Sequence, residues 1–347
     1  MKKLTLILLL LVAAAPCTFR SQAQERPWMK YITPSGYYQA GYSIDDALNN
    51  TFYIKRARIA LAGELINSER YGKVEYKVQA ELAGSPKLMD YFVRYTVRPE
   101  FGIIFGQTKT PLTVENSEYA PLKLELIDYS LVVQRFARMS ANDLYLKASS
   151  GGREMGIQFF GNWFKMNDGH ALVRYQVGLF NGNGINKNDD DRLKNFMARV
   201  MIFPIKDLSI SGCYERRLGH MDEVEIYNDY DYRILDRYGA AIAYDSKFAW
   251  FRTEYMAGHT FGWRAHGIYA TAGGKINGKI GIGLRYDYFA ENSRLPGGFF
   301  DHAQQHITAG FSWYVIPRIR LQLNYTLRKE PDLYPTHFVN FMTSISL

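Results

Sequence analysis

Basic side chains recur at alternate positions along several stretches of the chain. Arg56 and Arg58 are two residues apart, and Lys73 and Lys77 are four apart. In a β-strand, side chains separated by an even number of residues share a face. A face of basic groups attracts anions, and the guanidinium fork of arginine matches the oxygen atoms of phosphate. Our candidates for such an anion-attracting face are Arg56, Arg58, Lys73, Lys77, Arg94, Arg174, Arg199, Arg285 and Arg320.

Acidic residues occupy the same faces and offer a different interpretation. Many of the basic groups would then pair with a neighbouring carboxylate and stabilise the sheet, leaving little charge for a ligand. The acidic residues concerned are Glu64, Glu75, Glu81, Asp90, Glu154, Glu215 and Asp287.

The stretch from Lys87 to Pro111 shows the kind of element that would position these residues. Residues 89 to 97 alternate between an apolar and a polar side, residues 98 to 100 make a turn, and residues 101 to 106 return. A period of two predicts a strand with one apolar and one polar face. The predicted apolar face carries Met89, Tyr91, Val93, Tyr95 and Val97, and the polar face carries Asp90, Phe92, Arg94 and Thr96.

The same alternation continues to the last residue of the chain and predicts sixteen strands. Every second connection is short, for example residues 98–100 and 316–318, whereas the others include the long segments 107–152 and 218–235. Transmembrane β-barrels have an even number of strands, short turns on the periplasmic side and longer outer loops. A soluble β-sandwich, the competing interpretation, gives no reason for this alternation of lengths.

The N-terminal residues predict export. Lys2 and Lys3 precede the apolar stretch 4–15, and cleavage after Ala23 would remove residues 1–23 as a signal peptide. A second reading makes Cys17 a lipidated cysteine. The whole chain contains 26 Tyr, 21 Phe and 29 Gly, a composition that suits many strands joined by turns. No later run is long and apolar enough for a transmembrane helix.

These patterns together predict an all-β fold, a transmembrane antiparallel β-barrel of sixteen strands that occupies residues 24–347 as a single domain. The apolar faces would meet lipid and the charged faces would line a water-filled interior. The first strand must pair with the last, because an open edge in lipid leaves amides without hydrogen bonds. Residues 107–152 would form a long third outer loop that folds inward and constricts the channel. The candidate basic residues on this loop are Lys109, Lys123, Arg135 and Arg138.

Several local motifs resemble the phosphate-selective porin O and P family, with the similarity strongest over residues 52–200. The motifs are Phe52-Tyr53-Ile54-Lys55-Arg56-Ala57-Arg58-Ile59, Gly106-Gln107-Thr108-Lys109-Thr110-Pro111 with Glu115 shortly after, Gly152-Arg153-Glu154-Met155-Gly156-Ile157-Gln158 and Phe180-Asn181-Gly182-Asn183-Gly184. The resemblance implies a trimer of sixteen-stranded outer-membrane channels, some of which favour phosphate or polyphosphate.

We therefore expect a porin that passes small anions such as phosphate, is embedded in outer-membrane lipid and lipopolysaccharide, and forms a homotrimer. A non-selective diffusion porin, a barrel enzyme such as a phospholipase or protease, and an adhesin are the alternatives. No Ser/His/Asp arrangement predicts catalysis, no cofactor is implied, and the seven histidines lack metal-ligand spacing. Residues 181–191 lack the spacing of a calcium loop. The basic charge is spread over alternate strand positions, which argues against nucleic acid as a partner.

Overall fold

A computed structural model describes residues 31–137, 151–189, 194–219, 233–260, 263–293, 300–331 and 333–347. The predicted signal peptide, residues 1–23, and the candidate Arg138 lie outside these ranges.

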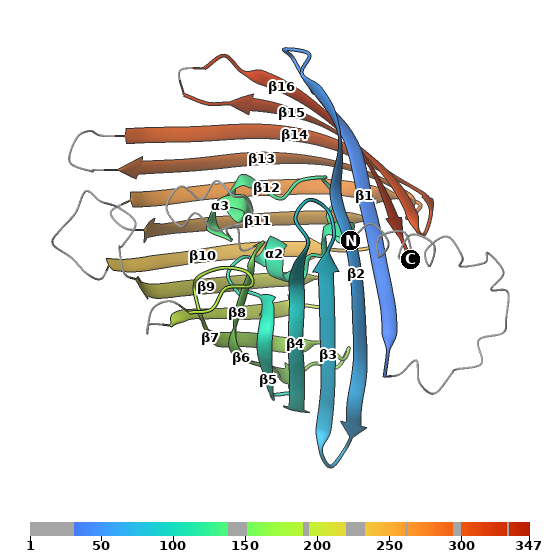
Figure 1. The fold of residues 1–347 in the computed structure, drawn as a ribbon, viewed down its shortest axis with the longest axis vertical. Helices are drawn as coiled ribbons and strands as arrows, with labels where there is room; N and C mark the ends of the chain where they lie inside the picture. Colours follow the sequence, from blue (N-terminus) through green and yellow to red (C-terminus); the bar gives the residue numbers. More distant parts are fainter. Residues whose placement is uncertain are drawn as a thin grey trace, which may run out of the picture.

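Within the described residues, sixteen antiparallel strands close into one barrel (Figure 1). Each strand pairs with its neighbours in sequence, and β1 pairs with β16. The strands are β1 Thr33–Asp45, β2 Asn50–Ser68, β3 Gly72–Glu81, β4 Lys87–Arg98, β5 Phe101–Lys109, β6 Arg153–Lys165, β7 Ala171–Phe180, β8 Asn195–Ile205, β9 Leu208–Gly219, β10 Arg233–Asp245, β11 Ala249–Thr260, β12 Trp263–Ile276, β13 Ile280–Ser293, β14 Phe300–Ile316, β15 Ile319–Lys329 and β16 Thr336–Ser346.

The closed sheet confirms the predicted fold class and strand number. Closure is direct, since Tyr38 of β1 lies opposite Ile345 of β16. Neither edge strand is therefore left without a hydrogen-bonding partner, which an open sandwich would not allow. Among the described helices, none combines the length and the apolar character needed to cross a membrane.

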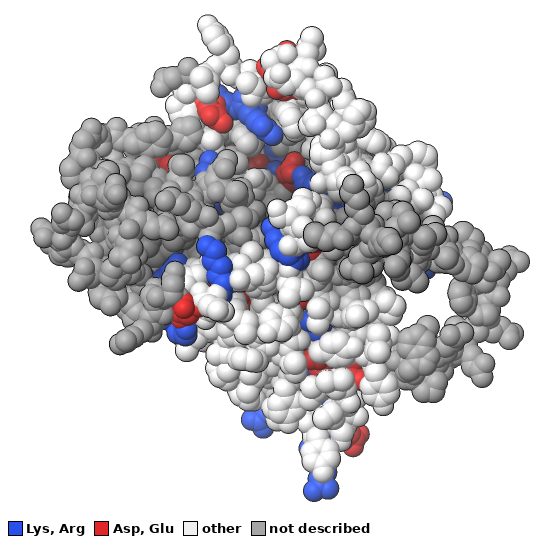
Figure 2. All heavy atoms as spheres, viewed as in Figure 1, with Lys and Arg blue, Asp and Glu red and all other residues white. Residues whose placement is uncertain are grey.

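The two faces of the sheet differ as the alternation predicts. Apolar side chains such as Ile59, Val93 and Leu323 are exposed on the outside of the barrel. Polar side chains at the alternate positions, such as Arg58 and Gln322, are buried inside it. Figure 2 shows blue and red side chains in the middle of the visible face and at its upper and lower ends, with uncharged stretches between them. A barrel with an apolar outside and a polar inside is matched to a lipid surrounding.

Two bulges shift residues from the predicted outer face to the inner one. Opposite Gln79 of β3, both Met89 and Asp90 of β4 point inward, and Met89 is only 2 % exposed. The prediction that Met89 lies on the outer apolar face was therefore wrong, and Leu88 is exposed there instead. In the same way the pairing of β1 with β2 passes from Arg56 directly to Ile54, so that Lys55 is the extra residue. An extra residue in one strand reverses the alternation locally.

The segment that follows β5 lies inside the barrel. Its described part contains three short helices, α2 Val114–Glu118, η2 Pro121–Lys123 and α3 Leu131–Phe136. Figure 1 shows α2 and α3 within the ring of strands, and α3 contacts β11, β12 and β13. The buried cluster that joins this segment to the inner wall consists of Leu112, Leu124, Tyr129, Leu131, Val132, Val133, Phe136 and Ala137 of the segment with Phe180, Met197, Met256, Tyr269 and Phe289 of the strands.

Candidate functional site

Several of the predicted basic residues form ion pairs inside the barrel. The carboxylate lies on a neighbouring strand, on the inner segment or two residues away on the same strand, and the ion-pair interpretation of the sequence predicts such pairs. The pairs and their N–O distances are Arg58–Glu81 2.7 Å, Lys77–Asp90 2.6 Å, Arg174–Glu118 3.0 Å, Arg285–Asp287 2.7 Å and Lys73 with Glu64 and Glu75 at 3.1 and 2.8 Å, and Arg199 also pairs with Glu118.

Others of the predicted residues have no carboxylate partner among the described residues. Arg56 donates to Gln39 Oε1 at 2.8 Å and lies over the ring of Tyr129. Arg94 lies over the rings of Phe92 and Phe160 at 5.8 and 5.3 Å. This group of basic residues, which we call the uncompensated cations, consists of Arg56, Arg94, Lys109, Lys123 and Arg320.

Arg320 and Arg135 both link the inner segment to the barrel wall, Arg320 from the wall and Arg135 from the segment. Arg320 donates to the carbonyl oxygen of Leu124 at 2.9 Å, while its Nε and Nη2 atoms are buried without a hydrogen-bond partner among the described residues. Arg135, on the segment itself, donates to Gln304 Oε1 of β14 at 3.1 Å. Buried donors of this kind are available to water or to an anion.

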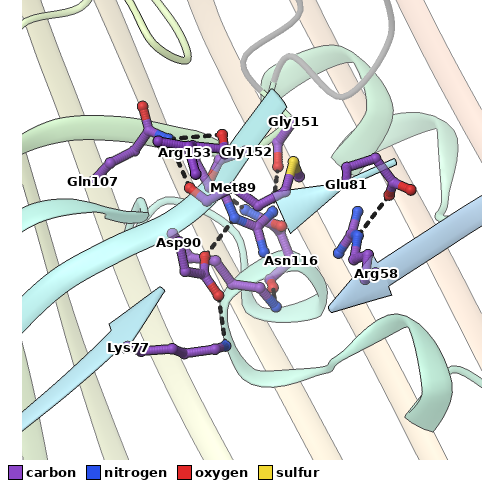
Figure 3. A network of polar contacts seen from close by, with 12 residues as sticks. Arg58, Lys77, Glu81, Met89, Asp90, Gln107, Asn116, Gly151, Gly152 and Arg153 are labelled. Carbon is purple, nitrogen blue, oxygen red and sulfur yellow. Dashed lines mark hydrogen bonds and ion pairs between the residues drawn. The ribbon is translucent and has the colours of Figure 1, made fainter. Parts of the chain in front are cut away.

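A network at β3, β4 and β6 carries more basic than acidic groups (Figure 3). Asp90 accepts from Lys77 at 2.6 Å and from Arg153 Nε at 2.5 Å, so one carboxylate faces two cations. Figure 3 shows the Arg58–Glu81 pair beside this group. Two acids against three bases leave a net charge of +1 in the network, which favours an anion nearby.

Inward-facing arginine and glutamine side chains hold the inner segment by its carbonyl oxygens. Arg285 Nη1 donates to Asp128 O at 2.7 Å, and Gln322 Nε2 donates to Glu125 O at 3.0 Å. Arg237 Nη1 donates to Phe136 O at 2.8 Å. Much of the basic charge of the wall therefore stabilises the segment in place.

Carboxylates hold the same segment by its amide groups. Glu254 Oε1 accepts from Val114 N at 2.9 Å, and Asp287 Oδ1 accepts from Leu131 N at 2.9 Å. Glu115 Oε2 accepts from Ser130 N at 2.9 Å, and burial raises the pKa of the Glu115 carboxyl. Val114 and Leu131 are the first residues of α2 and α3, where unpaired N–H groups favour an acceptor.

The three sequence motifs around Gly106, Gly152 and Phe180 meet at the base of the inner segment. Gly106 has φ +126°, and a Cβ there would lie 2.3 Å from Tyr91 O. This backbone turns Gln107 inward, where Nε2 donates to Met89 O at 2.7 Å and Oε1 accepts from Asn186 N at 2.7 Å.

Contacts from the other two motifs close the same base. Gly152 O accepts from Thr110 N at 3.1 Å, which joins the two ends of the segment. The carboxylate of Glu154 accepts from Gly184 N at 3.0 Å. The motif residues therefore support the base of the inner segment. The residue pattern of one strand does not reveal this role.

Sequence reasoning missed several basic residues of the interior. Lys55 pairs with Asp128 of the inner segment, and Arg252 pairs with Glu125 while stacking on Tyr119 at 4.0 Å. The signal for Lys55 was a lysine on an otherwise apolar strand face. The other missed residues, for which alternation with apolar neighbours was the available signal, are Arg153, Arg217, Arg237 and Arg328.

The described residues do not support the two other sites considered from the sequence, a calcium loop at residues 181–191 and a metal site. Asp189 pairs with Lys194, whereas Asp190 and Asp191 lie outside the described ranges. No group of three or more His, Cys, Asp and Glu residues among those described is arranged to hold a metal ion.

Comparison with solved structures shows the same fold in outer-membrane porins. OmpF from Salmonella typhi in complex with daunomycin has a TM-score of 0.69 and 10 % identity, over 91 % of this chain and 97 % of that one. An anion-selective porin from Comamonas acidovorans has a TM-score of 0.66 and 13 % identity, over 91 % and 99 %. OmpT of Vibrio cholerae, in a trimer form, has a TM-score of 0.67 and 10 % identity, over 91 % and 99 %.

No curated protein matches the chain. The family description "Phosphate-selective porin O and P" matches residues 35–229 and 251–336, which is most of the chain. The chain therefore belongs to the phosphate-selective porin O and P family and is a porin channel of the bacterial outer membrane.

Proposed function

We propose that this porin favours small anions, phosphate among them, over cations. The observation that supports this proposal is the group of uncompensated cations in the barrel interior, Arg56, Arg94, Lys109, Lys123 and Arg320. Two acidic groups, Glu115 of the inner segment and Glu254 of β11, are buried and accept from amide groups of the segment. Of the uncompensated cations, Arg94 and Lys123 retain solvent exposure, and cations exposed to the lumen attract anions.

The inner segment would constrict the channel. Its apolar residues pack against β7, β8 and β11 to β13, including Met256 and Phe289. Strands β2, β14 and β15 also contact the segment, through Lys55, Gln304, Arg320 and Gln322. The aqueous path would run past the basic side chains that retain solvent exposure, Arg94 and Lys123 among them.

We place the short connections on the periplasmic side and the longer ones outside the cell, following the usual arrangement of such barrels. We also propose a homotrimer, which the trimer form of the similar OmpT from Vibrio cholerae supports. The exposed apolar wall suits a surrounding of outer-membrane lipid.

The test is the reversal potential of the purified protein in a planar bilayer under a KCl gradient, repeated with added phosphate. We expect reversal on the anion side and a chloride current that phosphate reduces. In the triple variant Arg56→Gln, Arg94→Gln and Lys123→Gln, the reversal potential should move towards zero. The control is Lys73→Gln, because Lys73 already pairs with both Glu64 and Glu75. Cation-side reversal in the unmodified protein would overturn the proposal.

A non-selective diffusion porin is the second candidate function. It is favoured by the number of basic residues that already pair with carboxylates, such as Arg58, Arg285 and Arg252. In that case the reversal potential lies near zero and phosphate leaves the chloride current unchanged.

A further inference from the structure

A row of charged and polar side chains crosses four strands on the outside of the barrel. The row consists of Arg216 on β9, Asp236 on β10, His259 on β11 and Arg264 on β12. Register places them side by side, since Asp236 lies opposite both Arg216 and His259, and His259 lies opposite Arg264. We call these four residues the outward polar row.

The direction of these side chains follows from their neighbours along the chain. Arg217 and Arg237 point into the barrel, where their guanidinium groups donate to backbone carbonyl oxygens. The preceding residues, Arg216 and Asp236, therefore point outward, and their side chains are 49 % and 34 % exposed. His259 and Arg264 are exposed on the same face.

The outward polar row lies at the edge of the apolar outer wall. The next row along the same strands contains Tyr214, Tyr238 and His266. Beyond it, towards the middle of the strands, lie the exposed side chains of Ile210, Ile242 and Ile268. Charge, then aromatic rings, then aliphatic side chains is the order expected on crossing from lipid headgroups into the hydrocarbon region.

The charge of the row fits an anionic partner. Asp236 is its one carboxylate, and it accepts from Tyr214 Oη at 2.7 Å and lies 3.8 Å from Arg216 Nε. Arg264 has no carboxylate partner among the described residues, and His259 lies beside it in the register. Arginine forks at a membrane surface are suited to phosphate oxygens.

We propose that the outward polar row binds the phosphate groups of a lipid in the outer leaflet of the membrane. The row lies at the end of the barrel opposite the short connections, so the leaflet assignment rests on the orientation given above, whereas the headgroup chemistry does not. The site is separate from the channel, because its side chains point away from the interior.

The test compares lipid binding by the purified protein with that of the double variant Arg216→Gln and Arg264→Gln. The probe is diphosphorylated lipid A added to the protein in detergent micelles, with binding measured by native mass spectrometry. Two lost arginine contacts should weaken binding about 30-fold. The control is Arg70→Gln with Arg98→Gln, two basic residues in or beside the short turns at the other end, which should leave binding unchanged.

Three outcomes overturn the proposal. Equal binding by the double variant and the unmodified protein shows that the row is not the site. If inorganic phosphate competes for the outward polar row as strongly as lipid A does, the row is a site for a soluble anion and not for a lipid. Loss of chemical cross-linking between copies, without loss of lipid, assigns it to a contact between protomers. Channel conductance serves as the folding control and should be the same in the double variant and the unmodified protein. The lipid-binding test does not depend on the proposed anion selectivity and remains valid if that proposal is wrong.

Discussion

Lys109 Nζ donates to the backbone carbonyl oxygen of Asn116 at 2.5 Å and to that of Tyr119 at 3.1 Å. The lysine of the Gly-Gln-Thr-Lys-Thr-Pro motif thus spans from the end of β5 to the end of α2. It ties the inner segment to the strand from which that segment leaves, close to the base that Gly152 closes. Its charge acts first on the protein's own carbonyl oxygens.

Replacing Lys109 with Met should therefore loosen the segment. Two hydrogen bonds to carbonyl oxygens are lost, and the free energy of unfolding in urea should fall by about 2 kcal/mol. Open-channel current noise should rise, because we propose that the segment constricts the channel. Lys123→Met is the control, because Lys123 is exposed on the same segment and should leave stability unchanged. Equal stability of the two variants would refute the supporting role of Lys109.

Gly106→Ala should impair folding strongly. The φ angle of +126° disfavours any residue with a Cβ, and that Cβ would meet Tyr91 O at 2.3 Å. We expect a lower yield of folded barrel, measured as the fraction that resists unfolding in SDS without heating. Gly212→Ala is the matched control, because a Cβ there meets its nearest atom, Gly239 O, at 3.8 Å. A normal yield for Gly106→Ala would contradict this account of the motif.

The strands were predictable because each of their two faces meets a different medium. Apolar side chains such as Ile59 and Val93 repeat with a period of two, and every such run became a strand. The alternation of short and long connections predicted a barrel, because a transmembrane barrel has short turns at one end and longer loops at the other. These signals are local in the sequence, and no knowledge of strand pairing is needed to read them.

The partners of the inward-facing residues were not predictable in this way. Arg56 and Arg58 share a face, yet Arg58 meets Glu81 while Arg56 meets Gln39. The difference depends on register between strands, which the pattern of one strand does not contain. Bulges have the same origin: Lys55 and Met89 changed faces because of an extra residue opposite a neighbouring strand.

Arg252→Gln should release the inner segment from the wall at α2. Arg252 is almost fully buried, pairs with Glu125 and stacks on the ring of Tyr119 at 4.0 Å. Removing one partner of a buried pair costs about 3–5 kcal/mol, because the other charge is left without compensation. Unfolding in urea measures this loss. The double variant with Glu125→Gln should recover part of it, and no recovery would mean that the pair itself contributes little.

The Lys55–Asp128 ion pair should give the inner segment a dependence on low pH. Burial alone would raise the pKa of the Asp128 carboxyl, but the charges of Lys55, Arg285 and Arg56 hold it below its ordinary value of 3.8. A carboxyl whose pKa is lower in the docked segment stabilises docking while it is ionised. This contribution is full above pH 3.8 and is lost as the pH falls through the lowered pKa.

We therefore expect the part of the open-channel noise that depends on Asp128 to stay constant from neutral pH down to about the ordinary aspartate pKa and to rise below it. Asp128→Asn should show at neutral pH the noise that the unmodified protein shows in acid, and should change little on acidification. Asp168→Asn is the control, because His170 lowers the pKa of Asp168 in a short turn that does not touch the segment. If Asp168→Asn reproduces the effect, the acid response arises outside the Lys55–Asp128 contact.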